Sequence, residues 1–232
     1  MIRAAGGGRA AAAPAAILLD FDGLLCDTER AAFRSWQELY RWLGHEFPPH
    51  TWADMCGRSA GAETGLADLA GRLGRPVHPW EHAWRLRRKA ELAEQEPLRD
   101  GVGELLRAAV ERGTPVAVVS SSPREWVHHH LRRLGVLRRL ATVVTGEDAA
   151  RHKPAPDLYL VAVGRLGVAA TAAVAFEDSA TGVRAAVAAG LCCVAVPSAV
   201  GDRDALSGAH LVLDDLTGFD LTRVPVPHGA LR

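Results

Sequence analysis

The sequence lacks the charge imbalance and the long apolar runs that would place it with nucleic acids or membranes. Lys and Arg together number 27, as do Asp and Glu, so the formal net charge is zero. This balance offers no argument for a polyanionic partner, and we expect no nucleic acid to bind. No apolar stretch approaches the roughly 20 residues that span a bilayer, so we expect no membrane partner.

Cysteine is scarce and follows no metal-binding pattern. The chain has four cysteines, with no Cys-x-x-Cys spacing. The pattern indicates neither a zinc site nor a disulfide framework. Cys192 and Cys193 lie in an apolar run and are expected to be buried thiols. Such a chain suits a reducing compartment, and we predict a cytoplasmic location.

Length and composition allow one large domain or two smaller ones. The 232 residues are 48% hydrophobic, which is enough for a sizeable core. Residues 1–13 are rich in Gly and Ala and have no centre rich in Leu, Ile or Val. We predict a disordered tail there in preference to a signal peptide.

Apolar runs alternate with helical patterns along most of the chain. The runs have the length of buried parallel strands and span residues 15–19, 116–119, 142–144, 173–176, 192–196 and 211–213. The helical patterns between them span residues 103–112, 124–134, 157–166 and 181–189. This alternation predicts an α/β fold with a doubly wound, Rossmann-like parallel sheet.

One interval interrupts the alternation. Between Asp27 and Gly101 the pattern is helical, around residues 29–43, 60–73 and 80–93, with no convincing strand. We predict an inserted helical cap domain. The expected division is a tail at 1–13, a core at 14–27 and 98–232, and a cap at 28–97.

The motif with the most chemical content is Asp20-Phe21-Asp22-Gly23, directly after the first apolar run. On an extended chain Asp20 and Asp22 point to the same side. Two such carboxylates raise each other's pKa, and a cation removes that cost. Oxygen ligands suit Mg²⁺. One carboxylate can attack while the other moves a proton. The alternative is a solvated turn.

Three later strand ends also carry polar groups. Ser120 and Ser121 precede a helix start, a typical anion site. Lys153 lies between His152 and Pro154 in a stiff loop, where it can neutralise an anion. Glu177 and Asp178 follow the run at 173–176. Taken singly, these residues are also explained as helix caps and a surface lysine.

In this order, the segments DFDGLLCDTE, VVSSSP, HKPAPDLYL and FEDSATGVRAAVAAG resemble the four motifs of the haloacid-dehalogenase-like superfamily. The resemblance covers about residues 15–200. The helical insert resembles the C1-type cap of subfamily IA, in the β-phosphoglucomutase-like phosphatase group.

The resemblance implies a role for each motif. Asp20 would be the nucleophile that becomes an aspartyl phosphate, and Asp22 the general acid and base. Ser120, Ser121 and Lys153 would hold the transferring phosphoryl group.

The resemblance also implies a Mg²⁺ cofactor. Asp178 would bind it together with a carboxylate oxygen of Asp20 and the backbone carbonyl of Asp22. Glu177 would lie in the outer shell or near Lys153.

The expected activity is that of a Mg²⁺-dependent phosphatase acting on a sugar phosphate or a similar small metabolite. An acidic Asp22 favours phosphate esters, because an alcohol leaving group needs a proton donor. A sugar-phosphate mutase and a non-catalytic binding protein are the alternatives. The related mutases carry a histidine where this chain has Ala32, which disfavours the mutase. The sequence leaves the oligomeric state open, and a monomer is compatible with it.

Two sets of basic residues fall in the expected cap. Arg58 is placed to bind a second anionic group or a sugar hydroxyl, or is simply a solvated residue at a helix start. The basic run at residues 85–89 forms a solvated helix face or supplies a cation to the substrate.

Overall fold

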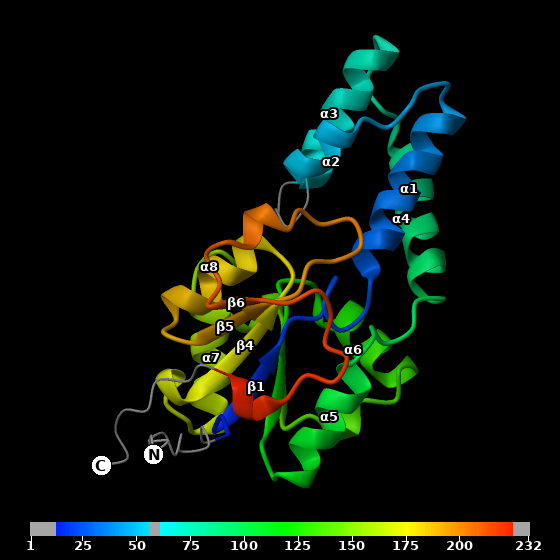
Figure 1. Ribbon diagram of the computed structural model, residues 1–232. Coiled ribbons are helices and arrows are strands. Elements are labelled where there is room, and N and C mark those ends of the chain that lie inside the picture. Colours follow the sequence, from blue (N-terminus) through cyan, green and yellow to red (C-terminus); the bar gives the residue numbers. More distant parts are fainter. Residues whose placement is uncertain (1–12, 56–60, 225–232) are drawn as a thin grey trace, which may run out of the picture.

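A parallel six-stranded sheet forms the centre of the molecule (Figure 1). The computed structural model describes residues 13–55 and 61–224. The strands are β1 (Ala16–Leu19), β2 (Val116–Val119), β3 (Thr142–Val144), β4 (Ala173–Glu177), β5 (Cys192–Ala195) and β6 (Leu211–Val212). Their order is β3-β2-β1-β4-β5-β6, and every neighbouring pair is parallel. The doubly wound α/β fold is therefore confirmed.

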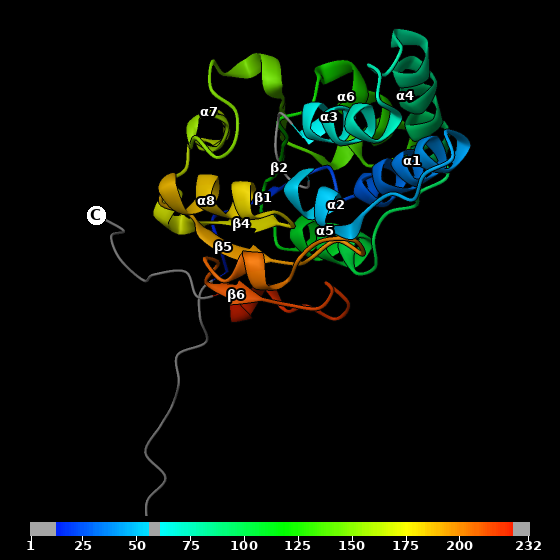
Figure 2. The same ribbon diagram turned by 90° about the horizontal axis from the view of Figure 1, so that it is seen from above.

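Helices cover both faces of this sheet (Figure 2). Ile17 and Leu19 pack on one face against α5 (Val102–Glu111) and α6 (Arg124–Arg133). Ala16 and Leu18 pack on the other face with α7 (Asp157–Leu166) and α8 (Ala180–Ala188). Successive strand side chains point to opposite faces, so a strand buried on both faces must be apolar throughout. This requirement explains the continuous run in β1.

The helical interval lies beyond the sheet, on the side where β1 ends (Figure 1). It contains α1 (Thr28–Trp42), α2 (Pro49–Met55), α3 (Gly61–Leu73) and α4 (Pro79–Ala93). These helices share their own apolar cluster, built around Trp36, Leu39, Tyr40, Trp52 and Leu69. The predicted all-helical insert after the first strand is therefore present. The domain boundaries drawn from the sequence remain a prediction.

Hydrogen bonds tie the second crossing between insert and core to the first. Cys26 forms an isolated antiparallel bridge with Leu98. The Arg99 guanidinium donates to the Pro197 carbonyl at 2.7 Å and also contacts the Gly23 carbonyl. The two crossings therefore lie side by side, next to the Asp20 motif.

The structure corrects one part of the sequence interpretation. The pattern predicts no helix between residues 43 and 60, yet α2 spans Pro49–Met55. Proline suits the first helical position, because its missing N–H would have no partner there and its φ is already helical.

Other expectations have mixed outcomes. Cys26, Cys192 and Cys193 are buried free thiols, as expected for the last two. No helix in the described part of the chain is long and apolar enough to cross a membrane. Most of the expected tail, residues 1–12, lies outside the described residues, and so does Arg58.

Candidate active site

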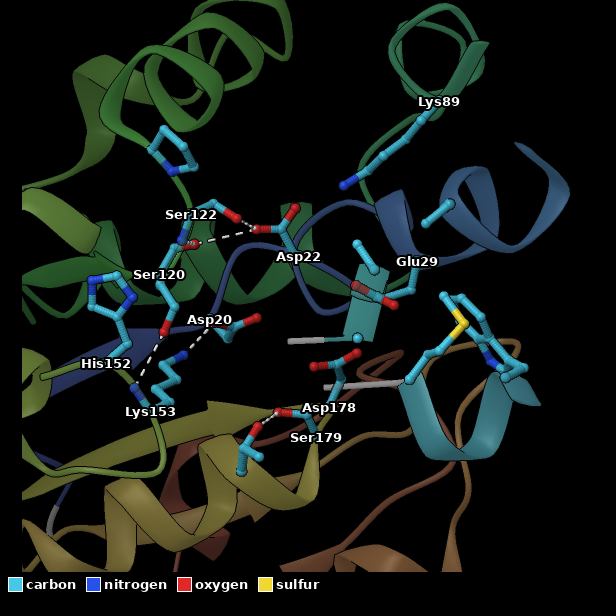
Figure 3. Close-up of a pocket in the computed structure, with 18 of the residues that line it drawn as sticks. Asp20, Asp22, Glu29, Lys89, Ser120, Ser122, His152, Lys153, Asp178 and Ser179 are labelled. Atoms are coloured by element: carbon cyan, nitrogen blue, oxygen red, sulfur yellow. Dashed lines mark hydrogen bonds and ion pairs between the residues drawn. The ribbon is translucent and has the colours of Figure 1, made fainter. Parts of the chain in front are cut away.

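Asp20 lies immediately beyond β1, at the centre of the sheet edge. Its backbone N–H donates to the Phe176 carbonyl of β4 at 3.0 Å, which fixes the residue between two strands. Its side chain accepts a hydrogen bond from the Lys153 ammonium (Figure 3). That ammonium also donates to the Val119 carbonyl at 2.9 Å and to Glu177 Oε1 at 2.6 Å. All three ammonium donors are thereby satisfied.

Carboxylates outnumber cations at this point. Oxygen atoms of Asp20, Glu177 and Asp178 lie within 4.8 Å of one another, and Lys153 contacts two of these carboxylates. Burial raises the pKa of Asp20 well above its ordinary value, because Lys153 only partly offsets the desolvation and Glu177 adds to it. Burial, followed by the charges of Asp20 and Glu177, likewise raises the pKa of Asp178. The cluster thus carries negative charge that the described residues do not balance.

Lys153 itself stays charged. Burial alone would lower its pKa, but the carboxylates of Asp20 and Glu177 outweigh burial and raise it. Three clustered carboxylates against one ammonium leave an excess of about two negative charges when all are ionised. A hard divalent cation with oxygen ligands matches both this charge and the donor set. The residues present therefore fit a magnesium ion.

Gly23 is required where Asp178 approaches the Asp20 loop. Its φ is +84°, and a Cβ atom placed there would lie 1.9 Å from Asp178 Oδ2. Only glycine accepts both this backbone conformation and so close an approach. The glycine of the motif therefore makes room for a carboxylate that comes from the end of β4, far away in the sequence.

Asp22 is held by hydrogen bonds from three separate elements. Its carboxylate accepts from Thr28 at 2.7 Å, Ser122 at 2.6 Å, Trp126 at 2.9 Å and Ser120 at 3.2 Å. Burial alone would raise its pKa, but the charge of Lys89 and these hydrogen bonds outweigh burial and lower it. Asp22 is therefore ionised in this arrangement, and its side chain points toward the serines (Figure 3).

A cavity of about 420 Å³ opens above these groups. Residues from both the sheet edge and the helical insert line it, including Asp20, Asp22, Ser120, Ser121, Lys153, Asp178, Trp36, Trp52, Arg85 and Lys89. Ser121 Oγ also accepts a 3.3 Å hydrogen bond from the Lys153 backbone N–H. The cavity can therefore hold a small anionic ester between two layers of the molecule.

Comparison with known proteins assigns this arrangement to a family. The sequence model of the haloacid dehalogenase-like hydrolases matches residues 14–190. The chain belongs to that family. This confirms the expected superfamily and the expectation of a hydrolase.

Individual relatives agree with the family assignment. "Putative phosphatase YhcW" of Bacillus subtilis (strain 168) is 36% identical over 187 residues, which cover 80% of this chain and 84% of that protein. "Validoxylamine A 7'-phosphate phosphatase" of Streptomyces hygroscopicus subsp. limoneus is 32% identical over 203 residues, covering 86% and 93%. A solved haloacid dehalogenase-like hydrolase from Deinococcus radiodurans R1, with bound phosphate and sodium, superposes with a TM-score of 0.74 at 30% identity, covering 87% of this chain and 92% of its own.

This haloacid dehalogenase-like hydrolase brings together most residues that the sequence singled out. Asp20, Lys153, Glu177 and Asp178 meet in one cluster, and Ser120 joins Asp22. The Asp22 side chain is not part of the cluster of potential ligand oxygens, and its backbone carbonyl as a metal ligand remains a prediction.

Sequence reasoning missed several contributors. Ser122, Thr28 and Trp126 hold Asp22, while Tyr159 donates to Glu177 at 2.6 Å. Ser122 could have been found from the sequence, because it follows Ser120 and Ser121 directly. No sequence pattern marks Trp126 or Tyr159 as neighbours of these carboxylates, because both contacts depend on how helices pack on the sheet.

Proposed function

We propose that this hydrolase is a Mg²⁺-dependent phosphatase that acts on a small phosphorylated metabolite through an aspartyl-phosphate intermediate. The observation that carries the proposal is the contact between Asp20 and Lys153 on the wall of the cavity. A carboxylate nucleophile and an anionic ester repel each other, and an ammonium between them offsets that repulsion. The names of the relatives, which include a "Phosphorylated carbohydrates phosphatase" of Thermotoga maritima, support a sugar phosphate or a similar ester.

The first chemical step uses Asp20 as the nucleophile. A carboxylate oxygen of Asp20 attacks phosphorus, and the bond from phosphorus to the leaving alcohol oxygen breaks. Lys153 and Ser120 hold the phosphoryl oxygens, and the departing oxygen takes a proton from Asp22. In the second step water attacks phosphorus while Asp22 takes its proton, which releases inorganic phosphate and restores Asp20.

Asp22 has to change its hydrogen bonds between the two steps. The lowered pKa keeps Asp22 ionised in the present arrangement, which is the form that can take a proton from water. To act as an acid, Asp22 must first carry a proton. Protonation becomes easier when fewer hydrogen-bond donors face its carboxylate. Thr28, the first residue of α1, is the donor that belongs to the helical insert. Movement of the insert would change the acidity of Asp22 by moving Thr28.

The carboxylates of Asp20 and Asp178, together with the Asp22 backbone carbonyl, are the groups we assign to Mg²⁺. When bound, the ion supplies positive charge to the transferring phosphoryl group and orients it. Glu177 shares its Oε1 with Lys153 and Tyr159. We therefore place Glu177 in the outer shell, where it positions Lys153.

A residue on the wall of the cavity favours a phosphatase over a mutase. Ala32 lines it and presents a methyl group where the resemblance places a histidine in the mutases. Phosphorus NMR on β-glucose 1-phosphate with a trace of the bisphosphate separates the two activities. Conversion to glucose 6-phosphate without inorganic phosphate would assign the mutase instead.

Phosphate release across a panel of sugar phosphates, nucleotides and glycolate-type esters tests the proposal directly. We expect Mg²⁺-dependent release of inorganic phosphate from at least one ester. Acid quenching during turnover should trap a phosphorylated chain. The Asp20→Asn variant should show no such covalent phosphorylation. Binding of esters without any release, in the presence of Mg²⁺, would favour the non-catalytic binding protein.

A further inference from the structure

Arg85 is a buried cation on the wall of the proposed active-site cavity. It belongs to α4, its exposed fraction is 4%, and it lines the same cavity as Asp20. Its guanidinium carbon lies 4.4 Å from the ring centroid of Trp36. Its hydrogen-bonding contact within the described chain is His82 Nε2, at 3.4 Å, and its buried Nε has no partner.

Several other arginines of the helical insert have carboxylate partners. Arg75 forms two hydrogen bonds with Glu81, at 2.8 and 3.0 Å, and Arg88 contacts Glu38 at 2.6 Å. Arg85 has no such partner among residues 13–55 and 61–224. Burial lowers its pKa to about 10, so the guanidinium remains charged at neutral pH. A buried charge without a counter-charge is costly unless a ligand supplies one.

The neighbouring cation on α4 is already matched. Lys89 lies four residues after Arg85, on the same helix face, and points toward Asp22 (Figure 3). Its charge lowers the pKa of Asp22 and opposes the rise that burial causes at Glu29. Lys89 thus acts on carboxylates of the proposed active site, whereas Arg85 has no carboxylate partner among the described residues.

We propose that Arg85 binds a second anionic group, a carboxylate or a phosphate, on the leaving group of the substrate. The inference rests on the proposed phosphatase function and narrows its substrates to phosphate monoesters that carry another anion. The Trp36 ring packs against the guanidinium, and the planar fork of a guanidinium can bind an oxyanion at two points. The cavity volume of about 420 Å³ is in the range of small-molecule sites and suits a small phosphate monoester with a second anionic group.

Matched substrate pairs test the inference. The carboxylate arm compares 3-phosphoglycerate with glycerol 3-phosphate, and the phosphate arm compares fructose 1,6-bisphosphate with fructose 1-phosphate. For wild-type protein we expect kcat/KM to be higher for the anionic member of at least one pair. Arg85→Gln should lower that value by at least about 30-fold, mainly through KM, and should lower kcat/KM for the neutral member far less. The arm that responds identifies the anion.

Two further variants keep the outcome clear. Arg87→Gln removes the same charge from an exposed position of α4 and should change neither pair. Arg85→Lys keeps the charge and should recover part of the selectivity, which also covers the case in which Arg85→Gln does not fold. Equal kcat/KM within both pairs for wild-type protein, or an equal loss for both members in Arg85→Gln, would overturn the inference. Continued hydrolysis of the neutral esters would then leave the phosphatase proposal standing.

If no ester in the panel is hydrolysed, the phosphatase proposal fails and the anion site is tested by binding. Calorimetry on wild-type protein with 3-phosphoglycerate and glycerol 3-phosphate, then with the two fructose phosphates, compares the same pairs. Tighter binding of an anionic member that Arg85→Gln removes would support the site. Equal binding within both pairs would overturn it.

Discussion

The Tyr159 hydroxyl donates a 2.6 Å hydrogen bond to Glu177 Oε1, the same oxygen that accepts from Lys153. Both side chains are fully buried. Tyr159 comes from α7 and Glu177 from the end of β4, so the bond joins a covering helix to the reaction centre. Glu177 is thereby fixed, and with it the position of the Lys153 ammonium against Asp20.

Tyr159→Phe should destabilise the fold and slow turnover modestly. Hydrogen bonds to charged groups contribute about 1.5–3 kcal/mol, and Glu177 would then keep its bond from Lys153 and a long one, 3.4 Å, from the Ser179 hydroxyl. We expect the free energy of unfolding to fall by that amount in urea titrations, with a several-fold lower kcat. Tyr40→Phe, which removes a hydroxyl bonded to Asp68 within the helical insert, should lower stability but not kcat. An unchanged urea midpoint in Tyr159→Phe would contradict the prediction.

Asp20→Asn should abolish phosphate release and leave the fold intact. The amide keeps the shape of the side chain but removes the attacking charge, so at least about a 1,000-fold loss is expected, on the scale of catalytic-group deletions. Because one buried carboxylate is lost from a crowded cluster, stability should not decrease sharply. Circular dichroism and an assay for inorganic phosphate measure both effects. Retention of near-wild-type turnover would exclude Asp20 as the nucleophile.

Removal of divalent metal should stop turnover, and Mg²⁺ should restore it. The excess negative charge of the Asp20, Glu177 and Asp178 cluster needs a cation. Binding to the folded state should also raise the unfolding temperature, which gives a readout independent of activity. Ca²⁺ should bind but support turnover poorly, because its coordination is looser. Asp178→Asn should lose the Mg²⁺-induced shift, and full activity in excess chelator would refute the requirement.

Gly23→Ala should damage the metal site and the fold together. The added methyl group would meet Asp178 Oδ2 at 1.9 Å, at a backbone φ of +84°. We expect a loss of stability of about 1–3 kcal/mol from backbone strain alone and a weaker response to Mg²⁺. Gly103→Ala is the control, because a Cβ there meets nothing within 4 Å and alanine favours the helix. Equal behaviour of the two variants in thermal unfolding would count against this account.

Asp148→Asn should show a stability loss that depends on pH. Burial alone would raise the pKa of Asp148, but Arg165 and the Thr145 backbone N–H and hydroxyl outweigh it and lower the pKa from 3.8 to about 2. A lowered folded-state pKa adds stability above pH 3.8, and this is lost as the pH falls through about 2. The variant should lose about 1–2 kcal/mol at pH 7 and little near pH 2.

Urea unfolding across that pH range measures the effect, with Asp214→Asn as the control. Asp214 is paired with Arg203, but its side chain is 90% exposed, and surface pairs contribute about 0–1 kcal/mol. A stability difference for Asp148→Asn that stays constant from pH 7 to pH 2 would argue against an ionised, hydrogen-bonded Asp148.

The sequence by itself determined the architecture and which polar residues meet at one edge of the sheet. A strand buried on both faces must be apolar throughout, so β1, β2 and β4 were recognisable from short runs. Polar residues directly after such runs must gather at one edge, because parallel strands end together. Asp20 and Asp178 are therefore assigned to a common site by their positions in the chain, whereas Lys153, which lies beyond η2 (Gly146–Asp148), is assigned to it by the resemblance. The helix α2 was missed because a pair of prolines suits both a loop and a helix start.

Only the tertiary structure decided how these groups are held and what else faces them. Trp126 reaches Asp22 across 104 positions of sequence, and Tyr159 reaches Glu177 only because α7 packs on the sheet. The basic run of α4 was equally compatible with a solvated face, and packing of α4 along α1 buried Arg85 while leaving Arg87 exposed. Local periodicity cannot reveal such choices, because they depend on which helix faces meet and on the charges already present where they meet.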